Sequence, residues 1–297
     1  MQRVTVPASS GNMSVGFDTA GVALSIYNHI DFEVRESGLT IEVDAPYLPT
    51  DKRNLVYRAA VRTASISGCT LPSLYMRQYG DIPKTRGLGS SAACIVGGVM
   101  IADSVLNLHM TQEDMLEIAA EMEGHPDNAA PAVFGGVCIT AKEKSGALLT
   151  RQLPVDGDIS AVVLIPGFPL STRKSRAAVP KCVPMSDAIM NLGRMGLLVS
   201  AFYSGDYSLL NTALDDRLHQ PYRKKLIGGY DRIISLCMKY GAYGAGLSGA
   251  GPTIIAYCRK DTASFCKNMK RELSRMKGGW NVVSADFDRR GAFVEML

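Results

Sequence analysis

A short glycine- and serine-rich segment followed by a long apolar run is the feature that most restricts what this chain can fold into. The segment reads GLGSS at residues 87–91, and the mostly apolar run occupies residues 92–108. Glycine lets the backbone approach a ligand closely and point successive N–H groups at it. The start of a helix adds unpaired N–H donors and a partial positive charge, which together favour a phosphate. The pattern therefore predicts a phosphate-binding loop that leads into a helix.

Two common phosphate motifs do not fit this segment. A P-loop requires a Gly-Lys pair, and the chain has none. Residues 87–92 match the dinucleotide pattern GxGxxA, but that pattern follows a buried parallel strand directly, whereas the upstream residues 74–79 alternate like a half-exposed strand. A second match at residues 244–249 leads into an apolar segment that is typical of a strand, not a helix. A dinucleotide-dependent oxidoreductase is therefore disfavoured.

Length and composition indicate an ordinary globular protein. A chain of 297 residues predicts two domains, and a polar stretch with proline and glycine at 154–158 divides it into domains 1–155 and 156–297. The net charge of +4 is too small to predict a nucleic-acid partner, and no apolar run is long enough to span a membrane. Seven scattered cysteines without CxxC spacing favour core thiols in a reducing compartment, so we expect a cytoplasmic protein.

Strand and helix signals form two mixed blocks, which predicts the α+β class. Asn54 and Thr111 are each predicted to cap a helix, the second through a capping box with Asp114. Helices are predicted at residues 54–66, 92–108, 111–123, 186–204, 208–214, 222–240 and 262–276, and strands at 4–6, 30–35, 39–43, 137–140, 148–153, 161–165, 253–257, 281–283 and 292–295.

Four motifs occur in the order that is typical of one enzyme family. They lie at residues 7–18 (PASSGNMSVGFD), 83–93 (PKTRGLGSSAA), 121–132 (EMEGHPDNAAPA) and 246–253 (GLSGAGPT). The first, second and fourth resemble the three motifs of the GHMP small-molecule kinases. The third resembles the EGHPDNxAPA motif of the homoserine kinases within that family, and the resemblance covers the whole chain.

The first motif departs from the pattern ANLGPGFD of that family. Val15 replaces a proline that would stiffen the turn, while Asn12 and Asp18 match the pattern. We therefore expect altered loop rigidity and an effect on substrate preference, but no loss of the chemistry. The differing positions are Gly11, Met13, Ser14 and Val15.

The resemblance implies an ATP-dependent kinase that phosphorylates the side-chain hydroxyl of L-homoserine to O-phospho-L-homoserine in threonine biosynthesis. It implies the GHMP kinase fold, with an N-terminal domain like domain 2 of ribosomal protein S5 and a ferredoxin-like C-terminal domain. ATP and Mg²⁺ are the implied cofactors, and L-homoserine is the implied partner. Members of the family are often homodimers, and we expect no nucleic-acid or membrane partner.

The resemblance also implies which residues form the site. Ser91 and Glu121 are the implied Mg²⁺ ligands, with Glu123 as the fallback, because Mg²⁺ prefers oxygen ligands. Arg176 and Arg223 are expected to hold the substrate carboxylate, since arginine offers a planar two-donor fork. The implied ATP-binding residues are Asn54, Pro83, Arg86, Gly87, Leu88, Gly89, Ser90, Ser91, Ala92 and Ala93; the implied substrate-binding residues are Asn12, Asp18, His125, Asn128, Thr172, Arg176, Arg223 and Gly249; the implied catalytic residues are Asn128, Asp127 and Arg176.

The general base and two other functions are left open at this point. Asp127 is the only nearby candidate base, and the resemblance also permits a mechanism without a dedicated base. The alternative functions are a GHMP kinase that acts on another alcohol, such as mevalonate, and a non-catalytic amino-acid-binding relative. Arg176 and Arg223 argue against the first alternative. Ser91 and Glu121 argue against the second, because binding alone needs no magnesium ligands.

Overall fold

The larger of two sheets organises the N-terminal part of the chain and includes the last strand of the sequence. In the computed structural model, which describes residues 1–45, 48–155 and 157–297, seven strands follow the order β11-β1-β2-β4-β3, and β5 and β6 continue from β2. Among the described strands of this sheet, β3 and β4 pair in parallel, and the other pairs are antiparallel. The strands are β1 (Gln2–Gly11), β2 (Ala20–Val34), β3 (Leu39–Val43), β4 (Leu74–Gly80), β5 (Val137–Lys142), β6 (Leu148–Leu153) and β11 (Phe293–Met296).

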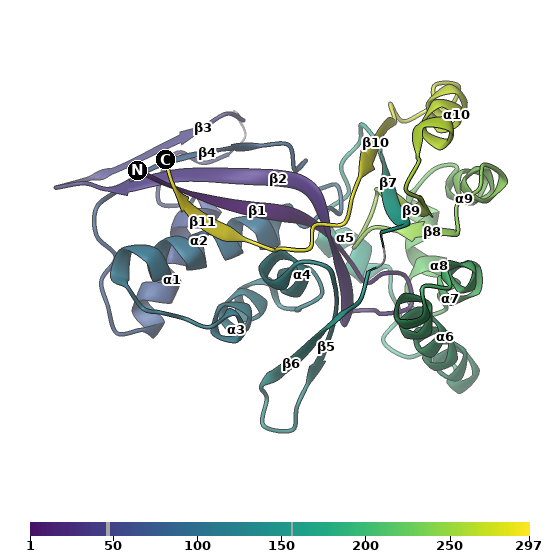
Figure 1. The fold of residues 1–297 in the computed structure, drawn as a ribbon, viewed down its shortest axis with the longest axis horizontal. Helices are drawn as coiled ribbons and strands as arrows, with labels where there is room; N and C mark the ends of the chain where they lie inside the picture. Colours follow the sequence, from purple (N-terminus) through teal and green to yellow (C-terminus); the bar gives the residue numbers. More distant parts are fainter. Residues whose placement is uncertain (46–47, 156) are drawn as a thin grey trace.

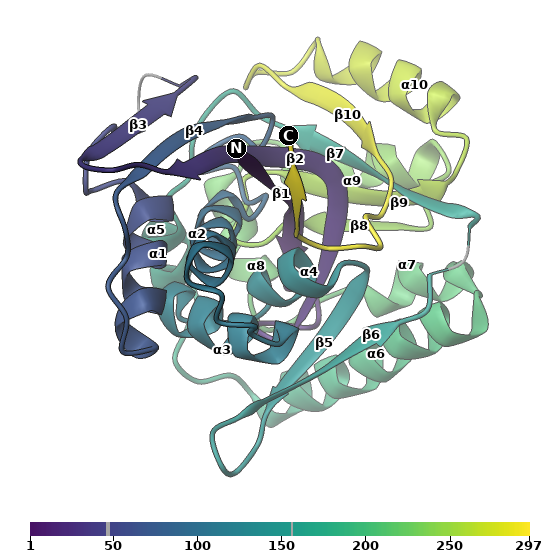
Figure 2. The same cartoon turned by 60° about the vertical axis from the view of Figure 1, so that its left-hand side comes forward.

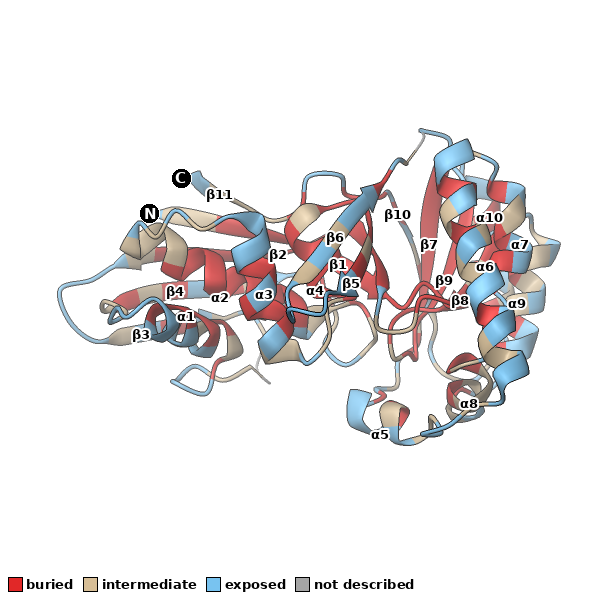
Figure 3. Cartoon of the chain, turned by 90° about the horizontal axis from the view of Figure 1, so that it is seen from below, coloured by how far each residue is buried: buried red, intermediate tan, exposed pale blue. Residues whose placement is uncertain are grey.

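Four helices cover one face of this sheet, with α2 packed against it (Figure 1). Residues 92–102 of α2 are all buried, and they are apolar or glycine. A helix that is apolar on every side fits a position between a sheet and other helices, and Figure 3 shows this buried layer. The helices are α1 (Leu55–Ile66), α2 (Ser90–Leu106), α3 (Gln112–Glu123) and α4 (Ala129–Phe134).

The second sheet has four antiparallel strands in the order β10-β7-β9-β8. With α9 between β7 and β8 and α10 between β9 and β10, this is the ferredoxin-like arrangement. The two helices and the sheet enclose a separate apolar core. The elements are β7 (Ile159–Ile165), β8 (Gly244–Leu247), β9 (Ile254–Arg259), β10 (Asn281–Ala285), α9 (Tyr230–Lys239) and α10 (Ala263–Leu273).

Several short helices and one long helix are inserted between β7 and α9. The long helix, α6, runs beside the β5–β6 hairpin of the first part of the chain (Figure 2). Two of the short helices, α5 and α8, carry the predicted carboxylate-binding arginines Arg176 and Arg223. The inserted elements are α5 (Thr172–Ala177), α6 (Met185–Ser204), η1 (Tyr207–Leu209), α7 (Leu210–Ala213), α8 (Gln220–Arg223) and η2 (Lys224–Leu226).

The two predicted helix caps are confirmed. Asn54 Oδ1 accepts a hydrogen bond from the backbone N–H of Val56 at 2.9 Å, at the start of α1. Thr111 Oγ1 accepts from the N–H of Asp114 at 3.1 Å, and Asp114 Oδ2 accepts from the N–H of Thr111 at 2.9 Å. These caps satisfy N–H groups that the helix itself leaves unpaired.

The prediction of a single helix at residues 222–240 is wrong. The structure divides this segment into the end of α8, η2 and α9, because Ile227 is extended (φ −126°) and Gly229 adopts a left-handed conformation (φ 81°). Strand β8 is absent from the sequence prediction, because its Gly-Ala-Gly-Leu sequence carries little strand signal.

The predicted division between residues 155 and 156 falls on the connection between β6 and β7, and residue 156 lies outside the described residues. The end of the chain does not stay with the second sheet, because β11 returns to pair with β1. In the segment between β10 and β11, the Asp286 carbonyl accepts a hydrogen bond from the backbone N–H of Ser25 at 2.9 Å. Among the described helices, none combines the length and the apolar character needed to cross a membrane.

We expect Gly98→Ala to lower the free energy of unfolding, although alanine is the better helix former. A Cβ at Gly98 would lie 2.6 Å from the Cβ of Ala59 and would overlap the Val56 carbonyl of α1, and overpacking of this kind costs roughly 1–3 kcal/mol. Gly193→Ala in α6 is the matched control, because no atom of the described part of the chain lies within 4 Å of its added Cβ; it should gain up to about 1 kcal/mol. Urea unfolding followed by circular dichroism measures both. A stabilised Gly98→Ala would contradict the close packing of α1 on α2.

Candidate active site

A cavity of about 320 Å³ lies between the glycine loop, the start of α2 and the inserted helices α5 and α8. Most of the residues predicted from the sequence line it, although they come from distant parts of the chain. Leu88, Ala92, Ala93, Asp18 and Glu121 are not part of its lining. The predicted residues that line it are Asn12, Asn54, Pro83, Arg86, Gly87, Gly89, Ser90, Ser91, His125, Asp127, Asn128, Thr172, Arg176, Arg223 and Gly249.

The glycine loop packs closely against the other glycine-rich motifs. Gly87 and Gly89 have φ angles of 79° and 67°, a left-handed region that favours glycine. The hydroxyl of Ser248 donates to the carbonyl of Gly87 at 2.5 Å, and a Cβ at Gly89 would overlap the side chain of Ser9. Leu88, with its side chain in the core, anchors the loop between these two glycines.

The start of α2 presents backbone N–H groups to the cavity. Its N-cap residue is Gly89, which has no side chain to bond them. The Ala93 N–H is already used by the Gly89 carbonyl at 2.8 Å, and Ala92 and Ala93 are buried. The N–H groups before Ala93, from Ser90 to Ala92, and the macrodipole of a 17-residue helix together suit an anion.

Two predicted ATP-binding residues have structural partners of their own. The amide nitrogen of Asn54 donates to the Pro49 carbonyl and to Gln78, at 3.0 and 3.2 Å, while its oxygen caps α1. The guanidinium of Arg86 donates to the carbonyls of Pro166 and Gly167 at 2.9 and 2.8 Å. Asn54 therefore fixes one wall of the cavity, and Arg86 ties the glycine loop to the end of β7.

Of the two glutamates considered as metal ligands, the fallback residue Glu123, and not Glu121, contacts Ser91. The Ser91 hydroxyl donates to Glu123 Oε2 at 2.6 Å. Glu121 forms an ion pair with Arg62 at 2.7 Å, and its side chain is 60% exposed. Residues two apart on a helix point in different directions, so α3 can direct only one of these carboxylates into the cavity. Burial raises the pKa of Glu123, and the Ser91 hydrogen bond opposes that shift.

His125, Asp127 and Asn128 form a hydrogen-bonded group in the lining of the cavity. Asp127 Oδ1 bonds to His125 Nδ1 and accepts from the Asn128 amide at 3.2 Å. Ser9 in turn donates to Asn128 Oδ1 at 3.0 Å. Asp127 is buried, and its Oδ2 atom has no hydrogen-bond partner among the described residues. A ligand atom from each of Asp127, His125 and Asp18 lies within 4.8 Å of the other two.

The two predicted carboxylate-binding arginines differ in their burial and in their hydrogen-bond partners. Arg176 forms a two-pronged ion pair with Asp18, at 2.6 and 3.1 Å. Arg223 is 1% exposed, donates to the Gly249 carbonyl at 3.3 Å, and has a buried Nε atom with no partner among the described residues. Both guanidinium groups lie over the ring of Phe17, at 5.8 and 5.1 Å from its centroid. Burial, together with the charge of Arg176, lowers the pKa of Arg223 to about 10, so it stays protonated at neutral pH.

The remaining predicted substrate residues also line the cavity. Asn12 is buried, and its Oδ1 accepts from the backbone N–H of Asp18 at 3.1 Å. Thr172 is exposed at the start of α5, and Gly249 donates its N–H to the Gly11 carbonyl at 3.0 Å. The first motif contains Phe17 but does not predict a role for its ring. Its position under both arginines is visible only in the folded chain.

The fold and this site define a small-molecule kinase. The family model of the GHMP kinases N terminal domain matches residues 54–136, and that of the GHMP kinases C terminal domain matches residues 198–273. The chain therefore belongs to the GHMP kinase family, in the group of the homoserine kinases.

Individual relatives agree with this assignment. A homoserine kinase of Caldicellulosiruptor saccharolyticus is 43% identical over 99% of this chain and 96% of its own. A homoserine kinase of Clostridium acetobutylicum is 39% identical over 99% of this chain and 100% of its own. The crystal structure of a homoserine kinase from Cytophaga hutchinsonii is similar with a TM-score of 0.89 at 28% identity, covering 99% of this chain and 96% of that one.

We expect His125 to titrate above its ordinary pKa, and Asp127→Asn to lower that pKa below the ordinary value. Burial alone lowers the pKa of His125, but the hydrogen bond and charge of Asp127 outweigh it. The protonated imidazole therefore stabilises the fold at low pH, and this contribution is lost as the pH rises through the raised pKa. Imidazole proton shifts followed by NMR across pH give the value, with His125→Gln to assign the signal among four histidines. An unchanged pKa in Asp127→Asn would exclude the pairing.

Proposed function

We propose that the protein transfers the γ-phosphoryl group of ATP to the side-chain hydroxyl of L-homoserine, giving O-phospho-L-homoserine in the cytoplasmic synthesis of threonine. The names of its close relatives support this acceptor. The physical observation that carries the proposal is a pair of buried atoms of opposite character, Asp127 Oδ2 and Arg223 Nε, which belong to residues that line the cavity and have no hydrogen-bond partner among the described residues.

These two atoms match a zwitterionic ligand. A buried polar atom without a partner costs roughly 1–3 kcal/mol, and a ligand that pairs both atoms recovers that cost on binding. An ammonium group suits the corner where the carboxylates of Asp18 and Asp127 converge. A carboxylate suits Arg223, which is desolvated and whose Nε has no partner among the described residues. In this arrangement Arg176 reaches the ligand from its ion pair with Asp18.

The opposite end of the cavity suits ATP. Leu48, Pro49 and Leu55 give it an apolar wall where an adenine ring can pack. The glycine loop and the uncapped start of α2 supply N–H donors for the phosphates. A single cavity that contains both ends allows the γ-phosphate and the acceptor hydroxyl to meet.

The oxygen donors present fit Mg²⁺. The Ser91 hydroxyl and the Glu123 carboxylate converge at 2.6 Å beside the start of α2, and Mg²⁺ at phosphate sites uses one or two such protein ligands. We therefore assign the metal position to Ser91 and Glu123. Bound there, the ion would supply charge neutralisation for the phosphates.

The acceptor hydroxyl is placed against Asn128 and Asp127. Ser9 and Asp127 hold the Asn128 amide from both sides, so its direction is fixed before the substrate arrives. The transition state of phosphoryl transfer is loose, and the nucleophile carries little charge early in the reaction. Asp127, which already bonds His125, is the group within reach for the proton that the hydroxyl releases.

Homoserine should be the best acceptor when ADP release is measured in a coupled assay with homoserine, mevalonate and shikimate in turn. Mevalonate has a carboxylate but no ammonium group, so it leaves the carboxylate corner around Asp127 unpaired. A homoserine analogue without its carboxylate should likewise react poorly. If homoserine releases ADP only at the background rate while another alcohol is phosphorylated, the proposed acceptor is wrong.

Glu123→Gln should lower turnover by orders of magnitude and raise the magnesium concentration needed for half-maximal rate, because it removes the carboxylate that we assign to the metal. Glu121→Gln is the matched control on the same helix. Its surface ion pair with Arg62 is worth at most about 1 kcal/mol, so its rate should stay near that of the wild type. Magnesium titrations of initial rate measure both. The opposite result, with Glu121→Gln inactive, would restore the sequence-based assignment.

A further inference from the structure

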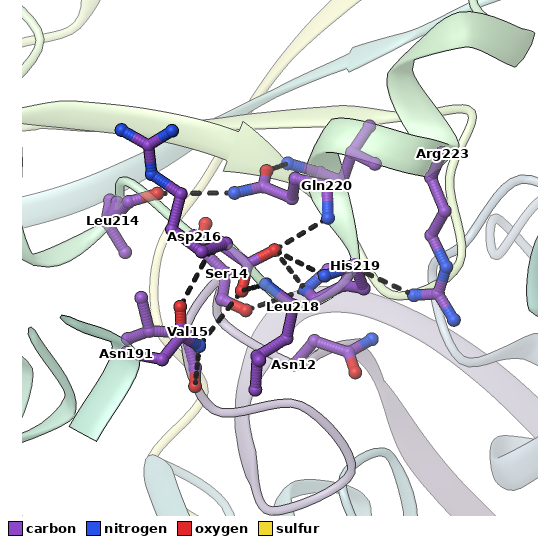
Figure 4. A network of polar contacts seen from close by, with 12 residues as sticks. Asn12, Ser14, Val15, Asn191, Leu214, Asp216, Leu218, His219, Gln220 and Arg223 are labelled. Carbon is purple, nitrogen blue, oxygen red and sulfur yellow. Dashed lines mark hydrogen bonds and ion pairs between the residues drawn. The ribbon is translucent and has the colours of Figure 1, made fainter. Parts of the chain in front are cut away.

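A buried polar network lies behind the acceptor end of the cavity and joins α6, the turn before α8 and the loop that follows β1 (Figure 4). Its centre is Asp216 and His219, whose side chains are both fully buried. Asn191 of α6 is also buried and belongs to the same network. The proposed catalytic arrangement uses none of these three residues, although all three are polar and withdrawn from water.

Asp216 fixes the backbone from which Arg223 extends. Its Oδ2 accepts from the N–H groups of His219 and Gln220 at 2.8 and 2.6 Å, and its Oδ1 accepts from the N–H of Leu218 at 2.9 Å. Helix α8 has only four residues, and so short a helix is unstable by itself. The carboxylate of Asp216 therefore holds the start of the turn that carries Arg223.

The two ring nitrogens of His219 contact two different parts of the acceptor site, the loop that follows β1 and the guanidinium of Arg223. Nε2 lies 2.6 Å from the Ser14 carbonyl oxygen, and Nδ1 lies 3.1 Å from Arg223 Nη1. A carbonyl can only accept and a guanidinium can only donate. The ring must therefore be neutral, with its proton on Nε2. Burial lowers the pKa of His219, and the Arg223 charge adds to that shift against the opposing charge of Asp216, which agrees with the neutral ring.

The loop that His219 contacts has an unfavourable backbone. Asn12, Met13 and Ser14 have φ angles of 66°, 36° and 61°. The left-handed region costs non-glycine residues roughly 1–2 kcal/mol each. Besides the bond from His219 to Ser14, the Asn191 amide donates to the Val15 carbonyl at 3.2 Å. Two side chains of the second part of the chain thus hold this loop in the shape that directs Asn12 into the cavity.

We propose that His219 is a positioning residue of the acceptor site: it aims Arg223 through Nδ1 and holds the loop at residues 12–18 through Nε2. This inference rests on the proposed function, because it assigns Arg223 to the carboxylate of the acceptor. It predicts that changes at His219 weaken acceptor binding while ATP binding is preserved, since the network lies behind the acceptor end alone.

Two substitutions separate the two bonds. The amide of His219→Gln reaches the position of Nε2 and can still donate to Ser14, but it provides no acceptor for Arg223. The amide of His219→Asn reaches the position of Nδ1 and can still accept from Arg223, but it loses the hydrogen bond to the Ser14 carbonyl in the loop. Each variant should raise the homoserine KM roughly ten- to hundredfold, the range for one lost hydrogen bond that involves a charged or buried group. The ATP KM should stay unchanged.

A double-mutant cycle with Arg223→Lys then assigns each effect. If His219 acts through Arg223, the KM effect of His219→Gln should largely disappear in the Arg223→Lys background, since both changes disturb one interaction. The effect of His219→Asn arises at the loop and should multiply with that of Arg223→Lys. Equal coupling of both variants to Arg223→Lys would overturn the division of roles. An unchanged homoserine KM in either folded variant would overturn the positioning role itself.

His29→Gln is the matched control. His29 bonds Thr5 at 3.0 Å, and its ring lies tilted against that of Tyr79 in the first sheet, away from the cavity, so the homoserine KM of His29→Gln should equal that of the wild type. Far-UV circular dichroism checks folding, and if His219→Gln does not fold, the KM of His219→Asn decides the outcome alone. The two proposals fail differently. A wild type that does not phosphorylate homoserine refutes the function, whereas an active wild type with unaffected His219 variants refutes only the positioning role.

Discussion

The close approach of three backbone segments around the glycine loop is the constraint on which the site depends. Gly87 accepts a hydrogen bond from Ser248, Gly89 lies against Ser9 with no room for a Cβ, and Gly249 donates to the end of β1. These segments belong to both parts of the chain. Because a backbone group of a glycine takes part in each of these contacts, the phosphate-binding end and the acceptor end keep a fixed separation, which in-line transfer requires.

The charges of the cavity divide into a satisfied pair and an unsatisfied pair. Arg176 and Asp18 neutralise each other through two hydrogen bonds, whereas Arg223 and Asp127 each keep a buried atom without a partner among the described residues. The first pair costs little in the absence of ligand and sets the shape of the site. The second pair favours a ligand that brings both charges at once, because a ligand with one charge leaves the other group desolvated and unpaired.

Local signals predicted much of this structure, and contacts between distant residues explain what they missed. The cap at Asn54 depends on residues within one helical turn, so its sequence suffices. The motifs favoured Glu121 over Glu123, whereas in the structure Glu123 contacts Ser91, because the contact depends on which side of α3 faces α2. The role of His219 could not be predicted from the sequence, because its partner Ser14 lies 205 positions away. The return of β11 to β1 is equally non-local.

The return of the last strand also limits how the molecule can move. The chain passes between the two sheets twice, once from β6 to β7 and once from β10 to β11. Near the second passage, Ser25 and Asp286 bond each other through two hydrogen bonds of 2.9 Å. A rigid body attached at two points can turn only about the line that joins them. Any rigid-body opening of the cavity must therefore satisfy both connections, and rotation about the line that joins them is the simplest movement that does so.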